Sequence, residues 1–185
     1  MIGSVVVPMP TAATCGDHAA MTSTLPADRP DGLSSPSAVE DAGVRDARAI
    51  VARVEADEAA ARKAREQYRR DGIPAIEADD VVARHLHGGE RVYARRSSTT
   101  IEGQGADGDA IEAAAGASLY LTSTRLLHLG RRVVSLELED IEELAIVGNR
   151  LLVTMHDGSG RAIGVSEPHL LRAQVAAVRA ERRQP

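Results

Sequence analysis

The stretch Ser118-Leu119-Tyr120-Leu121-Thr122-Ser123-Thr124-Arg125-Leu126-Leu127-His128-Leu129 decides the fold of this chain. Residues 118–122 alternate in polarity, residues 123–124 suit a turn, and residues 125–129 form a second apolar run. Alternation with a period of two is typical of a strand that buries one face. Two such runs joined by a short polar turn predict an antiparallel hairpin.

The same pattern continues on both sides of this hairpin. Upstream, residues 91–101 predict one strand, and residues 103–116 predict a loop rich in glycine, alanine and acidic side chains. Downstream, turns at Gly148-Asn149 and Asp157-Gly158-Ser159-Gly160 separate further apolar runs. The chain is therefore expected to hold about seven short antiparallel strands, the later ones at residues 134–138, 141–147, 151–155 and 161–165.

A helix is predicted after the last strand. Ser166-Glu167-Pro168 opens it, with proline in the first turn, where it is tolerated. An apolar face follows, formed by Leu170, Leu171, Val175 and Val178. Strands followed by one amphipathic helix predict an α+β fold. Their order resembles a small antiparallel barrel of the pleckstrin-homology (PH) type, in which the C-terminal helix closes an open end.

Specific residues carry a closer resemblance. Leu119 to Leu127 resembles the L-x-L-T-x-x-R-L signature of GRAM and bacterial PH-like domains, and Gly89-Glu90-Arg91-Val92 leads into the first strand as in those domains. Residues 134–141 look like the strand that those domains place next. The resemblance covers residues 86–183. It implies a non-enzymatic module: eukaryotic members are membrane-associated, many PH domains hold phosphoinositides through Lys and Arg around the first hairpin, and bacterial members fit scaffolds that bind proteins.

The chain is expected to have four parts. Residues 1–37 are rich in Pro, Thr, Ser and Ala, a composition that predicts a disordered tail. Residues 38–74 predict a long charged helix, residues 75–88 a short linking helix, and residues 89–185 the PH-like barrel with its C-terminal helix.

The long helix has the spacing of a capping box at Ser37 and Glu40, and Gly72-Ile73-Pro74 is a stop signal. Its apolar residues follow a heptad seam that Glu58 interrupts, formed by Val44, Ala47, Val51 and Val54. Glu58, Arg62, Glu66 and Arg70 then alternate in sign every four residues. Two interpretations stay open: a helix exposed to solvent, or a helix that docks on a partner, including a second copy of the chain.

Composition excludes several classes of protein. The 185 residues carry a net charge of −5 and only three aromatic side chains, Tyr68, Tyr93 and Tyr120, so neither duplex nor single-stranded nucleic acid is an expected partner. A single cysteine, Cys15, excludes an internal disulfide and fits a reducing compartment. No apolar run reaches the length of a membrane span. A cytoplasmic location, with peripheral membrane contact as the alternative, is expected.

Motifs that suggest chemistry lack the context that chemistry needs. Gly103 to Gly108 reads G-x-G-x-x-G, but a polar strand precedes it, whereas a dinucleotide site follows a buried one. Asp107 and Asp109 are followed by Ile111 where a calcium loop needs a third oxygen ligand. His85 and His87 do not share a helix face. No catalytic, metal-binding or cofactor-binding residue is therefore predicted, and no cofactor.

Two functions remain in competition. The first is a non-enzymatic interaction or regulatory module of bacterial type that binds a protein through the PH-like barrel and the helical arm. The second is a peripheral membrane protein that binds anionic lipid head groups through four arginines, Arg95, Arg96, Arg131 and Arg132. The loop after the first strand argues against the second function, since it contains Glu102, Asp107, Asp109 and Glu112 and no basic residue.

Overall fold

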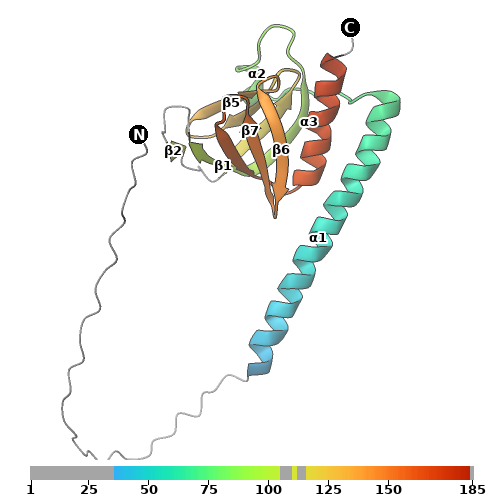
Figure 1. Cartoon of the computed structure of the whole chain (residues 1–185), viewed down its shortest axis with the longest axis vertical. Coiled ribbons are helices and arrows are strands. Elements are labelled where there is room, and N and C mark those ends of the chain that lie inside the picture. Colours follow the sequence, from blue (N-terminus) through green and yellow to red (C-terminus); the bar gives the residue numbers. More distant parts are fainter. Residues whose placement is uncertain (1–35, 105–109, 112–115, 184–185) are drawn as a thin grey trace, which may run out of the picture.

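The computed structural model describes residues 36–104, 110–111 and 116–183. Within these ranges it contains three helices and eight strands, and the strands form one antiparallel sheet (Figure 1). The strands run in the order β5-β4-β3-β1-β8-β7-β6, and the short β2 pairs with β1. Apart from its last two residues, the tail predicted at residues 1–37 lies outside the described residues.

The hairpin predicted from residues 118–129 forms two neighbouring strands of the sheet. Its strands are β3 (Ala117–Thr122) and β4 (Arg125–Leu129), paired in register from Ser118 opposite Leu129 to Leu121 opposite Leu126. The other strands are β1 (Val92–Gln104), β2 (Ala110–Ile111), β5 (Val133–Glu137), β6 (Ile141–Val147), β7 (Arg150–Met155) and β8 (Gly160–Gly164). Every predicted strand is present, and β2 falls inside the segment predicted as a loop.

The long strand β1 ties the two halves of the sheet together. Residues 92–99 pair with β3 and residues 100–104 pair with β8, with a register irregularity between Arg96 and Thr99. The approach to β8 is tight: a Cβ atom added at Gly164 would lie 2.3 Å from Oγ1 of Thr100. A larger residue at position 164 would therefore force the side chain of Thr100 to move.

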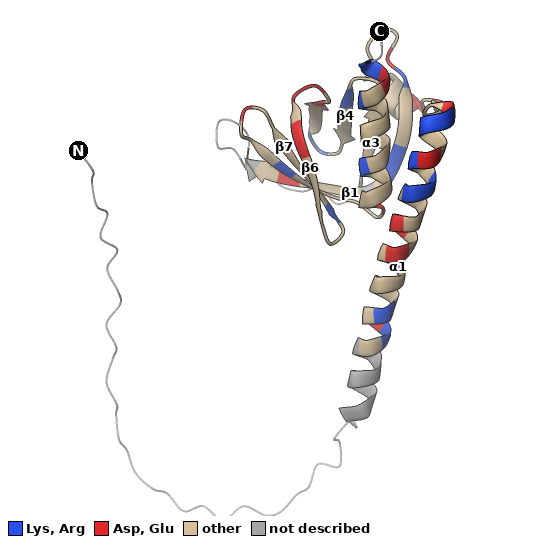
Figure 2. Cartoon of the chain, turned by 45° about the vertical axis from the view of Figure 1, so that its right-hand side comes forward, with Lys and Arg blue, Asp and Glu red and all other residues tan. Residues whose placement is uncertain are grey.

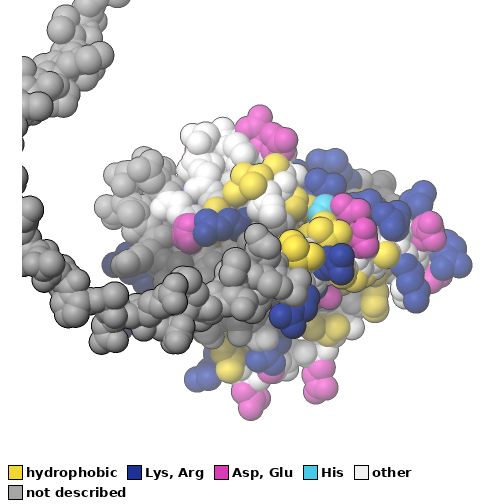
Figure 3. Space-filling view, turned by 90° about the horizontal axis from the view of Figure 1, so that it is seen from below, with side chains coloured by type: hydrophobic (Ala, Val, Ile, Leu, Met, Phe, Trp, Pro, Cys, Tyr) yellow, Lys and Arg dark blue, Asp and Glu magenta, His cyan; other side chains and the backbone are white. Residues whose placement is uncertain are grey.

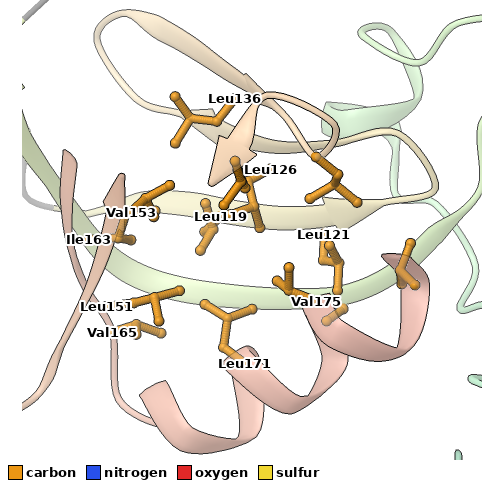
Figure 4. Packing of buried hydrophobic residues seen from close by; sticks show 14 of the residues in the cluster. Leu119, Leu121, Leu126, Leu136, Leu151, Val153, Ile163, Val165, Leu171 and Val175 are labelled. Atoms are coloured by element: carbon orange, nitrogen blue, oxygen red, sulfur yellow. The ribbon is translucent and has the colours of Figure 1, made fainter. Parts of the chain in front are cut away.

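The sheet does not close into a barrel. Strands β5 and β6 lie at the two ends of the strand order and do not pair with each other. The helix α3 (Pro168–Arg182) covers the curved sheet instead, and its buried residues Leu171, Val175 and Val178 enter the same apolar cluster as the strands (Figure 4). The expectation of a PH-like α+β fold is confirmed, with an open, strongly bent sheet in place of a closed barrel.

The core is aliphatic except for two tyrosines. Figure 4 shows leucine and valine side chains of the sheet directed toward Leu171 and Val175 of α3. Tyr93 joins this main cluster, whereas Tyr120 lies on the outer face in a smaller cluster with Val82, Val92 and Leu127. The second cluster attaches the segment before β1 to the back of the sheet.

The helix α1 (Pro36–Asp71) is 36 residues long, close to the expected range of 38–74. The expected linking helix is much shorter than residues 75–88. Only α2 (Asp80–Ala83) is helical, because Ile76 pairs as an isolated bridge with Val92 and Asp79 caps the helix from outside.

Candidate functional site

The long helix α1 is divided at Asp57 into two halves with different surroundings. Asp57, Ala61 and Ala64 are buried, and Tyr68 packs against the main apolar cluster. These positions lie three or four residues apart and therefore share one face of the helix. The C-terminal half thus docks on α3, and Tyr68 lies at this contact and not on the solvent-exposed side of the helix.

Asp57 joins α1 to the start of α3. Its two carboxylate oxygens accept hydrogen bonds from the backbone N–H groups of His169, at 2.8 Å, and Leu170, at 3.0 Å. These N–H groups belong to the first turn of α3, where no carbonyl of the helix itself can accept from them. Glu167, at the N-cap position of α3, makes no side-chain capping bond. The cap of α3 is therefore supplied by a residue more than a hundred positions earlier in the sequence.

The N-terminal half of α1 projects beyond α3 and the sheet. Figures 1 and 2 both show this half of the helix running clear of the remainder of the fold. Its aliphatic side chains are exposed: Val44 is 50% exposed, Ile50 54%, Val51 55% and Val54 39%. We call these four residues together with Ala47 the arm strip. The face formed by Ala47, Ile50 and Val54 continues, at helical spacing, the face that docks further along at Asp57 and Ala61.

Hydrophobic side chains also reach the surface in the space-filling view from below. Figure 3 shows them among Arg and acidic side chains on this face of the molecule. Two further exposed valines lie on the sheet, Val133 at the start of β5 and Val147 at the end of β6. Single exposed apolar residues are common on soluble proteins, whereas a regularly spaced strip on one helix indicates a contact surface.

The four arginines predicted as an anion site have different environments. Arg95 forms an ion pair with Asp79 at 2.9 Å and lies over the ring of Tyr120. The neighbouring Arg96 is directed to α3, with a hydrogen bond of 3.1 Å to Gln174 and an ion pair of 3.4 Å to Glu167. Both arginines of β1 are therefore engaged within the fold.

Arg131 and Arg132 lie in the turn between β4 and β5 and are exposed. Strands β3 and β4 separate this turn from β1, so the structure does not gather the four arginines into one cluster. Only the pair in the turn is presented to solvent without an ion pair inside the described part of the chain.

A buried ionic cluster that sequence reasoning missed lies at the start of β1. The carboxylate of Glu90 accepts two hydrogen bonds of 3.0 Å from the guanidinium of Arg125, and others from the hydroxyls of Thr122 and Thr124. The side chain of Glu90 is 1% exposed and that of Arg125 is 9% exposed. The signal was present in the sequence, because Thr122 and Arg125 are polar residues at the ends of two otherwise apolar runs.

This cluster, which we call the Glu90 cluster, strongly lowers the pKa of Glu90. Burial alone would raise the pKa of Glu90, but the hydrogen bonds from Arg125, the His87 backbone and the two threonines hold this pKa at about 2. Arg125 also donates to the backbone carbonyl of His85 at 2.7 Å. The cluster therefore fixes the segment before β1 to the hairpin of β3 and β4. The carboxylate of Glu90 and the guanidinium of Arg125 are both bonded to groups of the same chain.

A groove of about 790 Å³ lies between the last turns of α1 and the C-terminal half of α3. Alanines of α3 and Ile73 line it, and Arg65, Arg69 and Tyr68 come from α1. The carboxylate of Glu181 lies at its edge and is already bonded to the N–H of Ile73 and the hydroxyl of Tyr93.

No group of three or more potential metal ligands occurs among residues 36–104, 110–111 and 116–183. In the same ranges, no helix has the length and apolarity that a membrane span requires. Gly105, Asp107 and Asp109 of the loop motifs lie outside the described residues. His128, on β4, is buried, and this burial lowers its pKa.

Neither a protein-family model nor a curated protein matches the chain. Among solved structures, the Vps36 N-terminal PH domain is similar with 16% sequence identity and a TM-score of 0.43, over 52% of this chain and 85% of that chain. A second similar structure is the C-terminal domain of an unknown protein from Leishmania infantum, with 12% identity and a TM-score of 0.35, over 49% of this chain and 86% of that chain.

Proposed function

We propose that this chain is a non-enzymatic interaction module of the GRAM-related, bacterial PH-like class, cytoplasmic in location, that binds a protein partner through the arm strip. The observation that carries this proposal is the exposure of the strip. Val44, Ile50 and Val51 are each half exposed or more. They belong to a helix whose other half is already packed against α3.

The energetics favour a partner for this half of α1. Most of the stability of a helix in a protein comes from packing of its apolar face, and the arm strip has no such packing within the described residues. Each aliphatic side chain that moves from water into a contact contributes on the order of 1–2 kcal/mol. Packing a partner helix on the strip would both bury these side chains and hold the helix in place, which is the helix-in-groove mode of recognition.

The barrel-like sheet then serves as the base of the arm. Its core and the cap from Asp57 hold the C-terminal half of α1 at a fixed place on the fold. The direction in which the free half points is therefore set by the fold, and a partner would be positioned relative to the sheet.

A single substitution in the strip tests the proposal. Val51→Glu places a charge in the strip, whereas Ala56→Glu makes the same change in charge at an exposed position on the opposite face of α1. The tagged full chain is used to capture proteins from cell extract. We expect the amount of at least one captured protein to fall about tenfold with Val51→Glu and to stay the same with Ala56→Glu. Identical captured proteins from both variants would argue against the strip as the binding surface.

Deletion of residues 38–74 is a poorer test. It would remove both the Asp57 cap of α3 and Ile73, a residue of the main cluster. Loss of a partner would then be indistinguishable from unfolding.

Membrane binding is the alternative, and the exposed pair Arg131 and Arg132 allows a clean measurement. If anionic lipid is the ligand, co-sedimentation with phosphatidylserine vesicles should fall when both residues are changed to Glu, since each arginine near an anionic surface contributes about 1 kcal/mol. Our proposal expects weak sedimentation that does not change with this double substitution.

A further inference from the structure

We infer that the partner on the arm strip is a second copy of this chain, packed antiparallel to the first across a two-fold axis between Arg48 and Ile50. This inference rests on the proposed function and names its partner. It comes from the spacing and sizes of the strip residues and from the length of α1 that α3 leaves uncovered.

The strip is complementary to itself in the antiparallel direction. Val44, Ala47, Val51 and Val54 occupy alternating seam positions of two heptads. When two such helices run in opposite directions, Val44 lies opposite Val54 of the second copy. Ala47 then lies opposite Val51 of the second copy, so each small side chain meets a larger one and the layers have similar volume. Ile50 flanks the axis and meets its own counterpart.

The parallel arrangement packs less well. It would place Ala47 opposite Ala47 of the second copy, which leaves a thin layer between two valine layers.

The lengths of the helices fit this pairing. α1 has 36 residues and α3 only 15, so α3 covers α1 no further than Asp57. The uncovered part, residues 36–56, is about 31 Å long at 1.5 Å per residue. In the antiparallel pair the two sheets lie at opposite ends of the shared helices.

Arg48, on one flank of the arm strip, limits the affinity of the dimer. Arg48 lies across the two-fold axis from its counterpart, and two guanidinium groups repel each other. Salt screens this repulsion and strengthens burial of apolar surface, so raising NaCl from 50 to 500 mM should tighten the dimer. A dimer held by ion pairs across the arm would weaken instead.

Sedimentation equilibrium of the purified full chain tests the inference. We expect a concentration-dependent mass that approaches twice the 19.5 kDa of one chain. Val51→Glu should weaken dimerisation at least tenfold, and Ala56→Glu should leave it unchanged. A monomer at all concentrations would overturn the inference. If the chain is monomeric but Val51→Glu still loses a captured protein, the inference fails and the proposed function stands.

Cysteine cross-linking decides the orientation. In a background in which the lone Cys15 is changed to Ser, Ala47→Cys and Val51→Cys proteins are oxidised separately and as a mixture. The antiparallel pair predicts a disulfide-linked dimer mainly in the mixture. Efficient cross-linking of Val51→Cys protein alone would show a parallel pair and overturn the inference.

Discussion

At the scale of single residues, the Glu90 cluster explains why the central motif carries a threonine and an arginine. Thr122 and Arg125 are polar residues on strands that are otherwise buried, and both bind the same carboxylate. A buried ion pair contributes little over an apolar substitute, but removing one partner leaves the other charge unpaired. The cluster is therefore expected to matter for stability far more than any surface pair.

The first prediction compares this cluster with an exposed pair. Glu90→Gln should lower the free energy of unfolding by about 3 kcal/mol, because Arg125 is left buried without its carboxylate. Glu102→Gln, in the exposed pair with Arg150, should cost less than about 1 kcal/mol. Urea unfolding followed by circular dichroism gives both values. Equal losses would mean that burial of the Glu90 cluster is not what makes it important.

The second prediction concerns pH. The pKa of Glu90 is lowered from 4.5 to about 2, so its stabilising contribution is complete above pH 4.5 and is lost as pH falls toward 2. A shift of this size corresponds to about 3 kcal/mol.

Measuring the free energy of unfolding at pH 6, 4.5, 3 and 2 should show a steeper loss for the wild type than for Glu90→Gln below pH 4.5. The lowered pKa of His128 adds a loss that begins near pH 6.5 in both proteins, so the difference between them isolates Glu90. Parallel curves below pH 4.5 would show that folding does not lower the pKa of Glu90.

At the scale of elements, α3 receives its cap from α1. The third prediction is that Asp57→Ala lowers the free energy of unfolding by about 1–2 kcal/mol, as loss of a helix cap does. Asp57→Asn should recover only part of this loss, because an amide offers one acceptor oxygen to the two N–H groups that the carboxylate accepts from. Glu55→Ala, two residues away on the exposed surface, is the control and should change stability by less than about 0.5 kcal/mol. An Asp57→Ala protein as stable as the control would mean that the cap is dispensable.

The elements also show what sequence can predict. Alternation and apolar runs between turns identified all seven main strands, and helical spacing identified the apolar face of α3, since these patterns depend on which residues are buried. The length of α2 was overestimated, because the pairing of Ile76 with Val92 is a contact between distant segments. The docking of α1 was left open for the same reason: the alternating charges at residues 58, 62, 66 and 70 describe only its solvent face.

The candidate surface was predicted in part. The seam of Val44, Ala47, Val51 and Val54 was evident from heptad spacing alone. Which half of α1 is free could not be predicted, because it depends on where α3 ends along α1. For the four arginines the local sequence was misleading. Two adjacent pairs suggested an anion site, but Arg95 and Arg96 form ion pairs with Asp79 and Glu167.

At the scale of the whole molecule, the fold separates a stable base from a projecting arm. The fourth prediction follows from this separation. A protein that begins at Ser37 should unfold within about 2 °C of the full chain, because residues 1–36 are predicted to contribute no packed core. Differential scanning calorimetry of both proteins gives the comparison. A midpoint lowered by more than a few degrees would mean that the N-terminal segment packs against the fold.

The central claim is that the free half of α1 packs against another protein chain, and photo-cross-linking in cells tests it most directly. A photoreactive amino acid is placed in the full chain at position 51, in the arm strip, or at position 56, on the opposite face of the helix. We predict a cross-linked product from position 51 and little from position 56, with the mass of two chains if the partner is a second copy. No product from position 51, or equal products from both positions, would contradict the account.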